Sequence, residues 1–94
     1  MDVSVEFAGV SRILAGTRGV SLSLQDGTTF REILGLLGSR YPELLGHVID
    51  PSENTLYAST ALSLNGKYMV PLERIDESPR DGDRLIFLSL MAGG

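Results

Sequence analysis

The printed chain ends in Gly93-Gly94, which follow an apolar run over residues 85–90 after only two intervening residues. Glycine has no side chain to pack, so these two residues are poorly suited to ordering a terminus. The same lack of a side chain suits them to enter a narrow channel that leads into another protein's active site. We therefore expect the carboxylate of Gly94 to be the reactive group and Gly93 to give it access. Because a free carboxylate is a poor acyl donor, we expect activation through a mixed anhydride, made from ATP by a partner enzyme.

The other residue types that carry out chemistry form no catalytic or metal-binding pattern. His47 is the only histidine and the chain has no cysteine, so we expect a structural histidine and no metal site. Asp81 and Asp83 flank Gly82, which is typical of a turn rather than of an acid–base pair. Residues 35–38 imitate the GXXG loop of one RNA-binding module, but they lie within a helical pattern without basic neighbours. We expect a chain that is not an enzyme and binds no cofactor.

Length and composition indicate one ordinary globular domain. The chain has 94 residues, 43% hydrophobic and 21% charged, with a net charge of −4. The acidic balance argues against nucleic acid as a partner, since a general nucleic-acid binder carries a basic stripe. No apolar run approaches the roughly 20 residues that span a bilayer. Residues 1–5 lack the features of a signal peptide, so we expect a cytoplasmic protein with no membrane partner.

The first half of the chain predicts two strands and a helix. Apolar and polar residues alternate over residues 3–7 and 20–24, as in half-buried strands. We expect the long connection between them, residues 8–19, to turn Val10, Ile13 and Leu14 inward. Thr29 and Glu32 then form a capping-box pattern at the start of a helix that ends before Pro42. Its apolar residues recur at helical spacing, which predicts one buried stripe: Phe30, Ile33, Leu34, Leu37 and Tyr41.

The second half predicts a hairpin and a final strand. Asn65-Gly66 is typical of a type I′ turn between two short strands in residues 61–70. The run over residues 85–90 is apolar on both faces, which indicates a central strand. The order strand, strand, helix, hairpin, strand predicts an α+β fold of the β-grasp, or ubiquitin-like, type. In it, one main helix covers one face of a mixed sheet of four or five strands.

The predicted layout implies a surface next to the reactive end. We expect a β-grasp domain over residues 1–90 and a flexible Gly-Gly tail over residues 91–94. If the helix covers Leu85 and Phe87, the alternate residues face the other side of the sheet, where they would bind a partner. The candidate partner-binding residues are Tyr68, Ile86, Leu88, Leu90 and Met91. The alternative is that residues 86 and 88 pack beneath the long loops.

Three segments together resemble the sulfur carriers of the MoaD/ThiS family, and the resemblance spans nearly the whole chain. These segments are Phe7-Ala8-Gly9-Val10 with Arg12 and Leu14-Ala15-Gly16; Leu64-Asn65-Gly66-Lys67; and the block from Asp81 to Leu88 followed by Ala92-Gly93-Gly94. The stretch between helix and hairpin is closer in length to MoaD, the small subunit of molybdopterin synthase. The chain departs from the family pattern at Ser89-Leu90, where members often carry Pro-Pro.

The resemblance implies a function without internal catalysis. An adenylating enzyme of the ubiquitin-activating type would activate Gly94, a sulfur donor would convert it to a thiocarboxylate, and the tail would deliver sulfur inside a partner. That partner would be an enzyme such as the large subunit of molybdopterin synthase. Carriers for cysteine synthesis or tRNA thiolation share the terminus. Two alternatives stay open: a ubiquitin-like modifier conjugated through Gly94 to lysines, and a noncovalent ubiquitin-like interaction domain.

Overall fold

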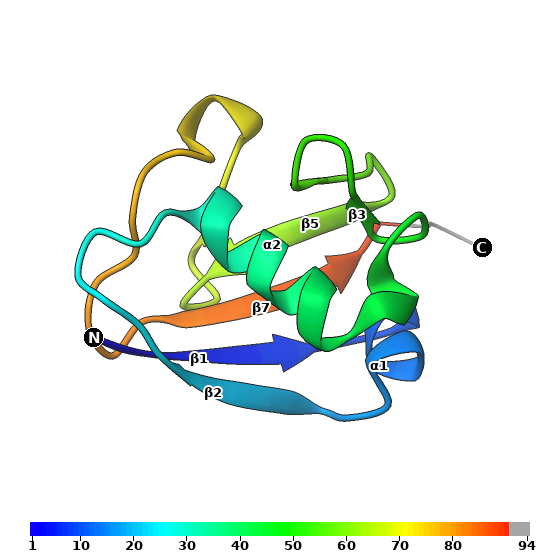
Figure 1. Ribbon diagram of the computed structural model, residues 1–94, viewed down its shortest axis with the longest axis horizontal. Helices are drawn as coiled ribbons and strands as arrows, with labels where there is room; N and C mark the ends of the chain where they lie inside the picture. The colour runs from blue at the N-terminus through cyan, green and yellow to red at the C-terminus, as the bar shows by residue number, and fades with distance from the viewer. Residues whose placement is uncertain (91–94) are drawn as a thin grey trace.

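A five-stranded sheet forms the body of the computed structural model, which describes residues 1–90. The strand order is β2-β1-β7-β5-β6 (Figure 1). The bounds are β1 Asp2–Phe7, β2 Gly19–Ser23, β5 Thr60–Leu64, β6 Tyr68–Met69 and β7 Arg84–Ser89. The adjacent strands β1 and β7 are parallel, and every other neighbouring pair in this sheet is antiparallel. The first and last strands of the chain therefore meet in the middle of a mixed sheet.

The main helix, α2 (Phe30–Arg40), covers one face of this sheet (Figure 1). Its capping box is complete: the Thr29 side chain accepts from the backbone N–H of Glu32, and the Glu32 carboxylate accepts from that of Thr29. These contacts satisfy two free donors of the first turn. The expected buried stripe is present, with Phe30, Ile33, Leu34 and Leu37 buried. The predicted β-grasp architecture is confirmed.

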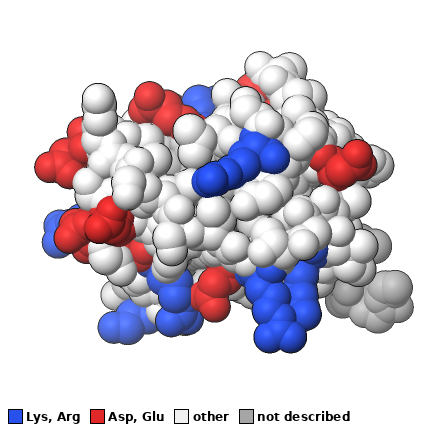
Figure 2. Space-filling model, turned by 60° about the horizontal axis from the view of Figure 1, so that its bottom comes forward, with Lys and Arg blue, Asp and Glu red and all other residues white. Residues whose placement is uncertain are grey.

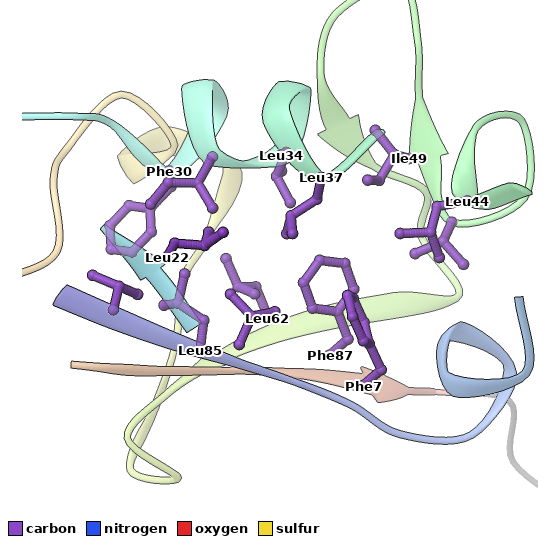
Figure 3. Packing of buried hydrophobic residues seen from close by; sticks show 14 of the residues in the cluster. Phe7, Leu22, Phe30, Leu34, Leu37, Leu44, Ile49, Leu62, Leu85 and Phe87 are labelled. Atoms are coloured by element: carbon purple, nitrogen blue, oxygen red, sulfur yellow. The ribbon is translucent and has the colours of Figure 1, made fainter. Parts of the chain in front are cut away.

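The core lies between α2 and the inward side chains of the strands (Figure 3). Leu85 and Phe87 of β7 are 0% exposed. The ring of Phe87 meets that of Phe7 edge to face, with centroids 5.3 Å apart. Phe7 in turn meets Tyr41, just past α2, at 5.4 Å. These aromatic contacts connect the end of the helix to β1 and β7.

The connection after β1 differs from the prediction. Residues Val10–Ala15 form a short helix, α1, and Ile13 is 78% exposed rather than turned inward. Val10 is also exposed, and only Leu14 of the three expected residues packs against the core. Ser11 is buried instead, and its hydroxyl donates to the carbonyl oxygen of Ala8. A small side chain that satisfies its own polar group thus occupies the inward position.

The remaining segments are short. A 3₁₀ turn, η1, spans Pro42–Leu44, and a second, η2, spans Leu72–Arg74. Between them, β3 (Ile49–Asp50) and β4 (Thr55–Leu56) form a two-stranded sheet. The hairpin between β5 and β6 has the predicted turn, with φ of 58° at Asn65 and 70° at Gly66. Asn65 also accepts from the backbone N–H of Arg84 and donates to Asp83, which fixes the start of β7.

Candidate functional site

The end of β7 is the part of the structure that leads to the predicted reactive group. β7 is the central strand of the sheet, between β1 and β5, and it ends on the same side of the molecule as α1 (Figure 1). Leu90, the last described residue, is 53% exposed, and its backbone N–H donates to the carbonyl oxygen of Ser59 at 2.8 Å. The predicted site residues Met91, Gly93 and Gly94 lie outside the described residues. The structure therefore fixes the chain up to four residues before Gly94.

The outward side chains of β7 lie on the face of the sheet opposite α2, which we call the open face. Ile86 and Leu88 are half-buried there, while Leu85 and Phe87 point into the core. Register places Ser63 and Ala61 of β5 beside them, at Ile86 and Leu88 respectively. Both neighbours have small side chains, so Ile86 and Leu88 retain partial exposure. The structure brings these two predicted residues together in line with Leu90.

Tyr68 does not join this group. It pairs with Leu64, which pairs with Leu85, and directly paired residues point to the same face of a sheet. Tyr68 therefore lies on the side of α2, where it lines a shallow groove with Phe30, and it is 69% exposed. Met69 takes the expected place, because it pairs with Ser63 on the open face and is exposed. The sequence analysis therefore assigned the wrong hairpin residue to the open face, Tyr68 instead of Met69.

An ion pair lies on the open face beside Ile86, because Glu6 of β1 is paired with Ile86 in the sheet register. Arg84, at the start of β7, forms an ion pair with Glu6 of β1 at 2.6 Å, and both side chains are about half exposed. Toward the other end of the strand, the outward residues Ile86 and Leu88 are apolar. On the side of the molecule drawn in Figure 2, acidic and basic side chains are interspersed with uncharged surface. The open face thus carries an ion pair beside Ile86 and is apolar at Leu88, nearer the end of β7.

Two exposed apolar residues beside the end of β7 were missed in the sequence. Val10 and Ile13 lie three residues apart on α1, and the backbone N–H of Val10 donates to the hydroxyl of Ser89. Their spacing fits one helical face. This helical spacing can be read from the sequence, but Gly9 and Gly16 on either side suggested a loop. Apolar side chains therefore lie both on the open face and on α1 near the point where β7 ends.

Within residues 1–90, no three acidic, histidine or cysteine side chains gather closely enough to hold a metal ion. The same part of the chain contains no helix that is long and apolar enough to cross a membrane. The candidate site in the described residues consists of the end of β7, which leads toward Gly94, and of the apolar side chains on the open face and on α1.

The sequence matches the ThiS family over residues 5–94. A search of curated protein sequences finds no match. Among solved structures, the small archaeal modifier protein 1 from Methanosarcina acetivorans is 26% identical, with a TM-score of 0.78, and the match covers 99% of this chain and 96% of that one. A chain in the crystal structure of the BexX/CysO complex from Amycolatopsis orientalis is also 26% identical, with a TM-score of 0.70 and coverage of 98% and 99%.

The name of a third similar structure refers to molybdopterin. It is a putative molybdopterin converting factor, subunit 1, from Pyrococcus furiosus, with 21% identity, a TM-score of 0.74 and coverage of 97% of this chain and 99% of that one. At this identity the likeness is one of fold. The match to the family, by contrast, spans nearly the whole chain and reaches its last residue.

Proposed function

The chain belongs to the ThiS family, and on that premise we propose that it is a sulfur carrier whose own C-terminus is the reactive group. In this proposal, a partner enzyme of the ubiquitin-activating type uses ATP to convert the carboxylate of Gly94 into an acyl-adenylate. Pyrophosphate leaves in this step. A sulfur donor at the oxidation level of sulfide then attacks the acyl carbon, AMP leaves, and a thiocarboxylate remains on Gly94. The carrier then delivers this sulfur in the active site of an acceptor enzyme.

One observation carries the proposal: the family match extends through residue 94 and so includes Gly93-Gly94. The fold agrees with it, because the last strand is the central one and leads directly toward the two glycines. Four residues in extended conformation reach roughly 13 Å beyond Leu90. That length suffices for the carboxylate to enter a deep pocket while the body of the carrier stays outside.

The open face supports docking of the carrier on its partners. Ile86 and Leu88 are partly exposed on β7, and the exposed Met69 lies on the same face two strands away, with Ser63 of β5 between Met69 and Ile86. A patch of apolar side chains is the usual centre of a protein interface. We propose that the activating enzyme contacts this patch, and that a sulfur-accepting enzyme of the molybdopterin synthase large-subunit type contacts it in turn. Because both partners need the same tail, they would bind one at a time.

Intact mass spectrometry tests the proposed chemistry. The full chain is incubated with ATP, a sulfur source and the activating enzyme encoded in the same genome. The expected product is heavier by the mass difference between one sulfur and one oxygen atom, and fragmentation places the change on Gly94. A matched control lacks only Gly94 and should fold alike but stay unmodified. If the full chain also stays unmodified with an enzyme that it demonstrably binds, the proposal is wrong.

A protein modifier is the second candidate, favoured by the 26% identity to the small archaeal modifier protein 1. It would use the same acyl-adenylate, but the amine of a target lysine would attack the acyl carbon and form an isopeptide bond. The same experiment separates the two functions when target protein is present. A covalent adduct on a lysine supports the modifier, and a thiocarboxylate without adducts supports the carrier. A chain that binds partners but forms neither product is a noncovalent interaction domain.

A further inference from the structure

The end of β7 loses one of its two neighbouring strands. Its pairing with β1 ends at Phe7 and Phe87, because the chain leaves the sheet after Phe7 to form α1. On the other side, pairing with β5 continues to Thr60 and Ser89, and Leu90 still donates to the carbonyl oxygen of Ser59 at 2.8 Å. A strand held on one side only can swing about that side. Some other contact must hold Ser89 on the side that β1 has left.

The side chain of Ser89 supplies this contact. Its hydroxyl oxygen accepts from the backbone N–H of Val10 at 3.3 Å. Val10 is the first residue of α1, and the residue before it, Gly9, has no side chain with which to cap the helix. Ser89 thus acts as a capping residue for α1, although it lies 79 residues from Val10 in sequence. One hydrogen bond fixes both the start of α1 and the end of β7.

Gly9 makes room for this bond. Its φ is +61°, a conformation that other residues rarely adopt. A Cβ atom at this position would lie 2.5 Å from the hydroxyl oxygen of Ser89, which is too close for any real contact. Glycine at position 9 and serine at position 89 are therefore fitted to each other. A larger residue at position 9 would therefore have to displace the Ser89 hydroxyl from this bond.

We propose that Ser89 is a positioning residue, which fixes the point and direction at which the chain leaves the sheet toward Gly94. The inference rests on the proposed function, in which the carboxylate of Gly94 must reach the reacting atoms of an activating enzyme. Without the Ser89 contact, the chain at Leu90 would be held through β5 alone. Fewer encounters with the activating enzyme would then present the carboxylate in the orientation that the reaction needs.

Steady-state adenylation kinetics with the activating enzyme test the role. Ser89→Ala is expected to lower kcat for ATP–pyrophosphate exchange by about two- to ten-fold, as expected for the loss of one hydrogen bond. KM for the carrier should stay unchanged, because the open face is untouched. Ser89→Thr keeps the hydroxyl and should retain the wild-type rate. Ser21→Ala removes an exposed strand serine far from the end of β7 and serves as the matched control.

A second measurement follows the contact itself. The amide hydrogen of Val10 should exchange faster with solvent in Ser89→Ala than in the wild type, while the amides of β1 stay protected. The positioning role is wrong if Ser89→Ala keeps the wild-type kcat, if KM rises instead, or if Ser89→Thr loses as much rate as Ser89→Ala. The proposed function is judged separately, by whether the wild-type chain is adenylated at all.

Discussion

The two faces of β7 use similar side chains for different purposes. Leu85 and Phe87 are fully buried beneath α2, whereas the alternate residues Ile86 and Leu88 keep part of their surface on the open face. All four are large apolar residues in one short strand. A half-exposed apolar side chain contributes less to folding than a fully buried one, since the stabilisation scales with the area removed from water. The comparison teaches that folding and partner binding can be separated by substituting neighbouring residues.

The largest effect on stability is expected on the face of β7 that α2 covers. Phe87→Ala removes a fully buried ring that contacts Phe7 and should lower the free energy of unfolding by about 3–5 kcal/mol. This is a large share of the total for a domain of this size. Urea denaturation followed by circular dichroism measures the loss. If the alanine variant is unfolded without urea, Phe87→Leu gives the smaller loss that can be measured.

Leu88→Ala is the matched comparison on the open face. Because Leu88 is half-buried, its truncation should cost about 1 kcal/mol and leave a cooperative transition. A cost equal to that of Phe87→Ala would mean that the difference between the two faces does not exist.

The second prediction concerns binding rather than folding. Leu88→Glu places a charge in the apolar part of the open face and should weaken binding to the activating enzyme at least about ten-fold. Stability should change by no more than about 1 kcal/mol, because the carboxylate can reach water. Isothermal titration calorimetry without ATP measures the affinity, and the melting temperature of the free carrier measures stability.

Ser21→Glu adds the same charge on β2, at the edge of the sheet, and should bind as the wild type does. This control separates a local effect at Leu88 from a general effect of negative charge. An unfolded Leu88→Glu variant would show instead that residue 88 belongs to the core, beneath the neighbouring loops.

The alternation on β7 was predictable from the sequence because its physical basis is local. Period-two patterns, a capping box and an Asn-Gly turn each depend on a few consecutive residues, and β1, α2 and the hairpin turn were predicted correctly. The face occupied by Ile86 and Leu88 then followed from one assumption, that the helix covers Leu85 and Phe87. The Gly-Gly end was equally visible in the sequence, although its structure lies outside the described residues.

The incorrect predictions depend on contacts between distant residues. α1 is only six residues long, has no capping side chain of its own and is held by Ser89 from the other end of the chain. No local pattern reveals such a cap, so Ile13 was assigned to the interior on hydrophobicity alone. Tyr68 was misplaced because the register between β5 and β6, not the alternation in β6, decides its face.

The smallest effect on stability is expected on the side of the sheet that α2 covers, where hydrogen bonds connect α2 to the segment before β7. Arg31 of α2 donates to both carboxylate oxygens of Asp76, at 2.8 and 3.3 Å, and to the carbonyl oxygen of Glu53. The hydrogen bond from Arg31 holds the pKa of Asp76 below its ordinary value of 3.8. A lowered pKa in the folded state stabilises the protein above the unfolded-state pKa, and this stabilisation is lost as pH falls through the folded-state pKa.

Asp76→Asn should therefore lower the urea midpoint slightly at neutral pH and reduce the further loss of stability below about pH 4. Arg31→Gln removes the same link from the other side. In a double-mutant cycle, the two substitutions should be less than additive at neutral pH and should approach additivity in acid, where Asp76 is protonated. Binding to the activating enzyme should not change in either variant, because neither residue lies on the open face. A loss of affinity without a loss of stability would place partner contacts on the side of α2, contrary to the division between the two faces.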